Sequence, residues 1–166
     1  MKKKAKPTID GRRVTLPRRD GGSLDILYYT APRSNAPLLL DVHGGGFISG
    51  HSESDDVLST LLSVRSDVNV ASVEYRYAPE VEYPVATEDC VDAINALCED
   101  STFDFNRDQL LLIGHSAGGN IVAGISILMM GKRTIAGQIL DYPLLDVKIA
   151  PNKRTPVIFS IPPSMM

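Results

Sequence analysis

A short apolar run, Leu110–Ile113, leads into Gly114-His115-Ser116-Ala117-Gly118, and apolar residues then recur at helical spacing through 117–130. This order constrains the fold most, because a strand that turns sharply into a helix needs very small residues around the turn. Such a turn lifts the serine hydroxyl above the sheet. The next backbone N–H then lies at a helix N-terminus, where developing negative charge is stabilised. The pattern indicates a nucleophilic serine. The alternative is a glycine-rich turn with an incidental serine.

The rest of the chain alternates between strand and helix patterns. The expected strands are Val14–Leu16, Leu24–Thr30, Leu38–Val42, Asn69–Glu74, Leu110–Ile113 and Ile135–Leu140. The expected helices run from Ser52 or Ser54 to about Arg65, from Val85 to Cys98 and from Ala117 to Met130, and the first has its apolar side in Val57, Leu58, Leu61, Leu62 and Val64. This alternation predicts an α/β fold, with a mostly parallel sheet of about six strands and helices on both faces. Ligands of such sheets bind at the carboxyl ends of the strands.

Two further motifs follow predicted strands. His43-Gly44-Gly45-Gly46-Phe47 comes directly after Leu38–Val42, and its glycines let backbone N–H groups approach a substrate oxygen closely. A flexible loop or a phosphate cradle is the alternative, although the fingerprints of nucleotide-binding loops are absent. Tyr75-Arg76-Tyr77-Ala78-Pro79-Glu80 follows Asn69–Glu74, and alone it indicates only an irregular turn before a helix.

Composition excludes several classes of protein. The chain has 166 residues, is 43% hydrophobic and 22% charged, and carries a net charge of -3, which suits one globular domain without a general attraction to nucleic acid or anionic membrane. Basic residues cluster near the start, at Lys2, Lys3, Lys4, Lys6, Arg12, Arg13, Arg18 and Arg19. A contact with nucleic acid or lipid is one interpretation. We favour a solvated arm, because no aromatic residues interleave these charges.

The absence of targeting and cysteine-pairing patterns in the sequence bears on localisation and redox chemistry. No apolar segment follows the N-terminal lysines as in a signal peptide, and no run reaches membrane-spanning length, so we expect a cytoplasmic protein. Cys90 and Cys98 fall eight positions apart on one predicted helix, about 12 Å along its axis, which is too far for a disulfide. Neither cysteine has a partner at metal-ligand spacing, so we expect no metal and no cofactor.

Together the three motifs resemble those of the hormone-sensitive-lipase-like family of α/β hydrolases, which includes bacterial acetyl esterases and carboxylesterases. That family has His-Gly-Gly-Gly, then Tyr-Arg-Leu-Ala-Pro-Glu, then Gly-Asp-Ser-Ala-Gly-Gly-Asn, in this order. Here Ser116-Ala117-Gly118-Gly119-Asn120 matches well, whereas Tyr77 replaces a usual leucine and His115 a usual aspartate. The resemblance runs from about Asp25 to Pro143. Segments 141–146 and 161–165 also look like parts of the family, the latter like the entry to its lid insertion.

The resemblance implies a short-chain carboxylic-ester hydrolase with an α/β-hydrolase fold. Ser116 would be the catalytic nucleophile, and Gly45, Gly46 and Ala117 would form the oxyanion hole. His43 would brace the glycine loop and would not act as the base. The implied reaction is acyl transfer from an ester to the serine and then to water.

The family's triad is incomplete in this chain. Its members run in the order serine, acid, histidine, but only Asp141 and Asp146 follow Ser116 among acids, and no histidine does. His51, just past the glycine loop, is the better substitute base geometrically, because His115 adjoins the serine on a tight turn that directs neighbouring side chains apart. We favour a surface or loop-bracing role for His51, and we expect the isolated chain to be inactive or weak.

The sequence pattern and the family resemblance together predict the domain organisation. We expect a flexible basic arm at 1–11, a partial α/β-hydrolase domain at 12–148 that lacks the last strands and helices, and an irregular tail at 149–166. Ile135–Leu140 would then be an exposed sheet edge, open to self-association or to a partner chain. Two alternatives to a truncated esterase stay open: a non-catalytic module that binds a small molecule, and one half of a split esterase completed by a partner.

Overall fold

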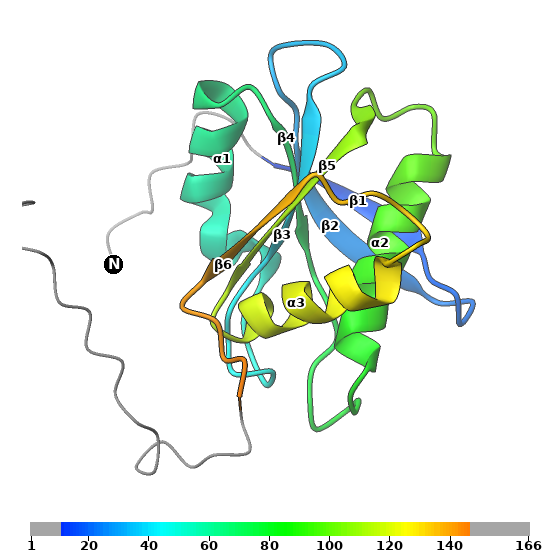
Figure 1. Cartoon of the computed structure of the whole chain (residues 1–166), viewed down its shortest axis with the longest axis vertical. Helices are drawn as coiled ribbons and strands as arrows, with labels where there is room; N and C mark the ends of the chain where they lie inside the picture. Colours follow the sequence, from blue (N-terminus) through cyan, green and yellow to red (C-terminus); the bar gives the residue numbers. More distant parts are fainter. Residues whose placement is uncertain (1–10, 147–166) are drawn as a thin grey trace, which may run out of the picture.

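Six strands form one sheet in the computed structural model of the chain, which describes residues 11–146 (Figure 1). The strands are β1 (Arg12–Pro17), β2 (Ser23–Tyr29), β3 (Pro37–Val42), β4 (Asn69–Val73), β5 (Asn106–His115) and β6 (Gly137–Asp141). Their order in the sheet is β1-β2-β4-β3-β5-β6. The β1–β2 and β2–β4 pairs are antiparallel and the other three pairs are parallel, which confirms the expected mostly parallel sheet.

Helices cover both faces of this sheet. The short 3-10 helix η1 (Ser52–Asp55) continues into α1 (Asp56–Arg65), which packs on one face against β4 and β2. On the other face, α2 (Val85–Glu99) and α3 (Ala117–Met129) pack side by side over the sheet (Figure 1). The sheet therefore lies between two helical layers of unequal size, and both parallel crossovers before β5 and β6 run through the larger layer.

The core follows the alternation of side chains along each strand. On β3, Leu38, Leu40 and Val42 face α2 and α3, whereas Leu39 faces the α1 side. The larger apolar cluster lies under α2 and α3 and includes Ile26, Ile94, Leu97, Leu112, Ile121 and Ile125. The cluster on the α1 side is much smaller: Leu27, Tyr29, Leu39, Val68, Val70 and Ile113, with Leu62 and Leu111 packed against it.

The orientation of α1 differs from the sequence expectation. Its buried side chains are Ser59 and Ser63, whereas Val57, Leu58, Leu61 and Val64 are exposed, Val57 by 70% and Leu61 by 50%. The reason is the buried Asp41 carboxylate in the sheet beneath α1. Asp41 Oδ2 accepts hydrogen bonds from Ser59 on α1, at 3.3 Å, and from Ser72 on β4, at 2.8 Å. Burying a carboxylate requires hydrogen-bond donors, so α1 turns its serines inward and only Leu62 reaches the apolar cluster.

The predicted element boundaries are close to those observed. β5 begins at Asn106, four residues before the expected Leu110, and β6 begins at Gly137, two residues after the expected Ile135. Cys90 and Cys98 are both free thiols on α2, as expected. The arm at 1–11 and the tail at 149–166 lie, apart from Gly11, outside the described residues. Within residues 11–146 no helix has the length and apolar character needed to cross a membrane.

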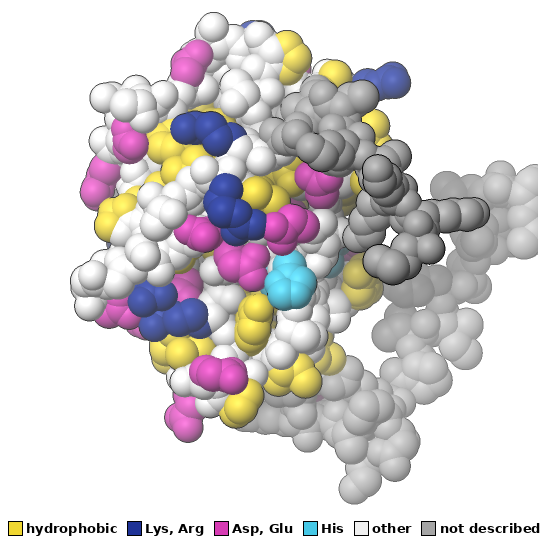
Figure 2. Space-filling model, turned by 180° about the vertical axis from the view of Figure 1, so that it is seen from behind, with side chains coloured by type: hydrophobic (Ala, Val, Ile, Leu, Met, Phe, Trp, Pro, Cys, Tyr) yellow, Lys and Arg dark blue, Asp and Glu magenta, His cyan; other side chains and the backbone are white. Residues whose placement is uncertain are grey.

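Charged side chains are intermixed on the surface. Figure 2, seen from behind the view of Figure 1, shows acidic and basic groups next to one another on one face. Several charged side chains of the protein pair, as in Arg33–Asp67 at 2.7 Å, Arg19–Asp92 at 2.7 Å and Arg13–Glu53. Arg12 and Arg13 of the basic N-terminal cluster lie on β1, so this part of the cluster belongs to the sheet.

Candidate functional site

Ser116 lies in the sharp turn between β5 and α3. Its backbone has φ 54° and ψ −112°, a conformation that non-glycine residues rarely adopt. A Cβ at Gly114 would overlap the Gly118 carbonyl oxygen, and a Cβ at Gly118 would overlap the Val42 carbonyl oxygen. The Ser116 N–H donates to the Asp141 carbonyl at 3.0 Å, which holds the turn against the end of β6. The glycines are therefore required by close backbone contacts, as the sequence pattern indicated.

The glycine loop after β3 lies directly against this turn. A Cβ at Gly44 would come within 3.1 Å of the His115 carbonyl oxygen and 3.5 Å of Ser116 Cβ. Gly45 and Gly46 have φ of 142° and 64°, which an L side chain would strain. Ala117, which is fully buried, is the first residue of α3, where backbone N–H groups lack a carbonyl partner within the helix. The loop and the helix start thus meet at Ser116.

His43 and Tyr75 brace the loop from beneath. The His43 ring is fully buried and stacks on the Tyr75 ring, with the centroids 4.3 Å apart and an interplanar angle of 17°. His43 Nδ1 lies 2.7 Å from the Gly44 carbonyl oxygen, so this nitrogen carries the proton, and the Tyr75 hydroxyl donates to the His43 carbonyl at 2.9 Å. Burial lowers the pKa of His43. Sequence reasoning assigned the bracing role to His43 but did not find Tyr75.

An apolar pocket opens beside the first turns of α3. It has a volume of about 280 Å³ and lies between the glycine loop, the irregular segment 75–84 and the starts of α2 and α3. Its lining includes Phe47, Tyr77, Val81, Pro84, Asn120 and Ile121. Arg76 fixes the segment through Asp89, with Nη2 2.7 Å from Oδ1, and the Tyr77 hydroxyl donates to the Gly50 carbonyl at 3.2 Å. The third motif, which alone indicated only a turn, therefore forms a wall of the pocket.

His51 and His115 make their side-chain contacts with carboxylates. His51 is 72% exposed, with Nδ1 3.6 Å from Glu74 Oε1. His115 is buried on the α1 side of the sheet, and its Nδ1 lies 2.9 Å from Asp141 Oδ2. Within residues 11–146, no histidine hydrogen-bonds Ser116. The structure therefore brings Ser116, Gly44 and Ala117 together, and it pairs Asp141 with His115 rather than with the nucleophile position.

Comparison with known proteins agrees with this fold. Residues 39–160 match a family described as having the alpha/beta hydrolase fold. The chain is 34% identical over 126 residues to an arylesterase of Saccharolobus solfataricus, covering 75% of this chain and 41% of that protein. It is 31% identical over 141 residues to an ethyl acetate hydrolase of Pseudomonas putida, covering 80% of this chain and 44% of the relative.

Solved structures give the same result. The carboxylesterase EstE1 from a metagenomic library superposes with a TM-score of 0.76 and 36% identity, over 84% of this chain and 48% of that one. An arylesterase structure superposes with a TM-score of 0.78 and 32% identity, over 87% and 48% of the two chains. This chain thus spans somewhat less than half the length of these relatives. Since both sequence and fold match, the chain belongs to the hormone-sensitive-lipase-like family of α/β hydrolases and corresponds to their N-terminal part.

Proposed function

We propose that this chain carries the nucleophile and the oxyanion-stabilising groups of a serine carboxylesterase that acts on short-chain esters. The observation that carries the proposal is the strained backbone of Ser116, at φ 54° and ψ −112°, with the glycine loop packed against it. Backbone strain of this kind costs about 1–3 kcal/mol and persists at functional sites where the surroundings impose it. An incidental serine in an ordinary turn would not need it.

The chemistry proposed for this site is acyl transfer. The Ser116 oxygen attacks the ester carbonyl carbon, and the carbonyl oxygen becomes an oxyanion. Backbone N–H groups of Gly45, Gly46 and Ala117 are proposed to donate to that oxygen, and the α3 N-terminus adds favourable electrostatic potential. The alcohol leaves, an acyl-enzyme remains, and water then releases the carboxylic acid. The apolar pocket lined by Phe47 and Tyr77 suits a hydrophobic part of the ester.

The isolated chain is proposed to be a slow catalyst. Within the described residues no histidine hydrogen-bonds Ser116, so the attacking hydroxyl is proposed to lose its proton without a histidine base. Enzymes that lose a triad member retain about 10³–10⁴-fold catalysis over water, from the oxyanion hole and substrate binding alone. We therefore expect weak turnover rather than the rate of a complete enzyme.

A specific observation favours the split-esterase alternative over a remodelled binding module. Among residues 11–146, β6 pairs with β5 on one side only, and Ile139 on it is 56% exposed. Val57 and Leu61 on α1 are exposed as well. A partner chain that pairs with β6 and covers α1 is the proposed source of a catalytic acid and histidine. The cytoplasmic location stays a prediction.

Two measurements on the purified chain test the proposal. Hydrolysis of 4-nitrophenyl acetate is expected to be slow but above background. A fluorophosphonate probe, incubated in excess, is expected to form one adduct on the tryptic peptide that contains Ser116, as seen by mass spectrometry. Ser116→Ala should abolish both signals. Ser126→Ala is the matched control, because this serine on α3 donates to Gln138 Oε1 at 2.7 Å and lies ten residues from the turn.

The outcomes separate the alternatives. Adducts spread over several serines, or unchanged in Ser116→Ala, would contradict the nucleophile assignment. Absent labelling and turnover together with saturable binding of an aryl ester would favour the non-catalytic binding module.

A further inference from the structure

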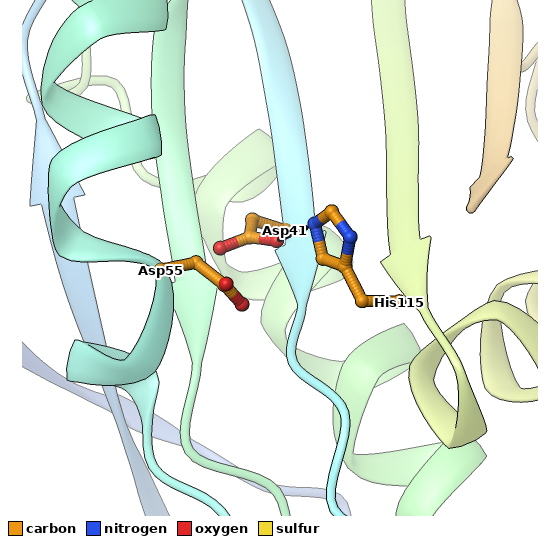
Figure 3. A group of neighbouring side chains, drawn as sticks. All are labelled: Asp41, Asp55 and His115. Carbon is orange, nitrogen blue, oxygen red and sulfur yellow. Dashed lines mark ion pairs between the residues drawn. The ribbon is translucent and has the colours of Figure 1, made fainter. Parts of the chain in front are cut away.

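Two carboxylate side chains and one imidazole, each from a different element, lie close together on the α1 side of the sheet. Asp41 comes from the end of β3, Asp55 from the end of η1 and His115 from the end of β5 (Figure 3). One ligand atom from each lies within 4.8 Å of the others, and His115 Nε2 is 3.7 Å from Asp41 Oδ1. Figure 3 shows the three side chains directed into the same space between α1 and the sheet.

The atoms that face one another in this cluster lack hydrogen-bond partners. Asp41 is 1% exposed and His115 is 7% exposed. Asp41 Oδ1, Asp55 Oδ2 and His115 Nε2 are buried without a partner among the described residues. Two carboxylate oxygens and an imidazole nitrogen in this arrangement are costly without a positive group between them, because each has lost its hydration. A cation at this point would satisfy all three.

The neighbouring groups orient the three atoms as metal ligands require. His115 Nδ1 lies 2.9 Å from Asp141 Oδ2, and in the neutral tautomer that donates its Nδ1 proton there, Nε2 has a lone pair directed at the cluster. Carboxylate–histidine–metal arrangements of this kind orient the ring and increase its basicity. The Ser72 and Ser59 hydroxyls occupy Asp41 Oδ2 at 2.8 and 3.3 Å, which leaves Oδ1 facing His115.

We propose that Asp41, Asp55 and His115 bind one divalent cation of the zinc class. The ligand set of one imidazole nitrogen and two carboxylates favours Zn²⁺ over Ca²⁺ and Mg²⁺, which prefer all-oxygen sites. Its two negative charges balance the charge of the cation. Tetrahedral zinc with bonds of about 2.1 Å needs ligand atoms about 3.4 Å apart, so only a small closure of the cluster is required.

The bound cation has a structural role in this proposal. It joins η1, β3 and β5 at the carboxyl end of the sheet, and its His115 ligand immediately precedes Ser116. The cysteines and the local spacing of ligand residues in the sequence indicated no metal, whereas these ligands are 14 and 60 positions apart in the chain. Only the packing of α1 and the β3–β5 pairing bring them together.

Calorimetric titration of the untagged, chelator-treated chain with ZnCl₂ tests the proposal without using ester hydrolysis. We expect one zinc per chain and a rise in the unfolding temperature of the wild type on adding zinc. Asp55→Asn and Asp41→Asn should weaken zinc binding by more than about 100-fold, and Asp141→Asn by about 10–100-fold. Circular dichroism of each variant without zinc checks that the fold is retained.

Two control variants exclude binding elsewhere. Glu53→Gln changes an exposed acid in the same turn, and His51→Ala removes the exposed imidazole nearby. Both should bind zinc like the wild type. The proposal is overturned if the wild type binds no zinc, or if folded Asp41→Asn and Asp55→Asn proteins bind it with undiminished affinity. Failure of the esterase proposal would leave this result unaffected.

Discussion

At the scale of single residues, the site depends on contacts that leave no room for a side chain. Gly118 is the clearest case, because its backbone passes beneath the carbonyl oxygens of Val42 and His43. Tyr75 and Tyr77 show the complementary device, in which side chains from one irregular segment donate to backbone carbonyls of the glycine loop. Both kinds of contact fix the positions of backbone groups around Ser116, and the effect of each on stability can be measured.

Gly118→Ala is expected to destabilise the protein strongly. The new Cβ would overlap the Val42 carbonyl oxygen, so β3 and α3 would have to separate, and overpacking of this kind costs about 1–3 kcal/mol or more. Urea denaturation followed by circular dichroism measures the loss. Gly124→Ala in the same helix is the control, because its Cβ meets only the Thr87 side chain at 3.2 Å and gains helix propensity. Equal effects of the two changes would contradict the steric explanation.

Tyr75→Phe is expected to lower the free energy of unfolding by about 1–2 kcal/mol, because it leaves the buried His43 carbonyl without its donor. It should also slow labelling of Ser116 by a fluorophosphonate, since the glycine loop loses a support. Tyr77→Phe removes a longer, half-buried hydrogen bond of 3.2 Å and should have the smaller effect on stability. The reverse ranking in denaturant titrations would show that Tyr75 does not brace the loop through this bond.

At the scale of elements, α1 is where sequence reasoning was wrong. The apolar residues of this helix repeat at helical spacing and indicate a buried face, but the sheet beneath α1 contains Asp41 and Ser72. Ser59 and Ser63 therefore turn inward. The sequences of β3 and β4 do not reveal that α1 covers polar residues, because the residues beneath a helix are known only once the strands are paired in the sheet. α2 and α3, which meet an apolar sheet face, lie within one residue of their predicted bounds.

Replacing Leu61 with lysine should therefore change the free energy of unfolding by less than about 0.5 kcal/mol, as is usual for surface positions. It should also lower any self-association of the chain, because it interrupts an exposed apolar face. Leu62→Lys is the matched comparison: Leu62 packs against the apolar cluster on the same side of the sheet, and its replacement should destabilise the fold severely. Urea titration and sedimentation velocity separate the two effects.

Much of the site could also be predicted from sequence, for a clear reason. The turn at Ser116 and the loop at Gly45 are determined locally by backbone geometry, and local geometry selects residue types directly. The pocket wall formed by Tyr77 and the cluster at Asp41 could not be predicted, because both depend on which elements meet in space. Asp141 follows the serine in the chain, but only the fold shows that its side chain pairs with His115.

At the scale of the whole molecule, the chain matches somewhat less than half the length of its relatives. Its sheet ends at β6, with β5 as the only neighbour of that strand among the described residues. Esterase activity of the site is best measured in a protein that also contains the rest of such a domain.

A chimera with a relative contains the rest of such a domain. The 126 residues that match the Saccharolobus solfataricus arylesterase replace the corresponding part of that protein. We expect the chimera to hydrolyse 4-nitrophenyl esters much faster than the isolated chain, because the remaining part would supply the acid and base. Ser116→Ala in the chimera should lower kcat/KM by about 10³-fold or more. A folded chimera whose activity is indifferent to that change would refute the esterase proposal.

The pairing of β3 with β5 also determines when the site can form. Leu38 lies opposite Leu110, although β4 and α2 separate them in the chain. Contacts of such sequence separation close large loops and form slowly. The glycine loop and the Ser116 turn follow these two strands, so reactivity of Ser116 should recover later in refolding than helical circular dichroism. The serine would then be a kinetic reporter of the last folding step.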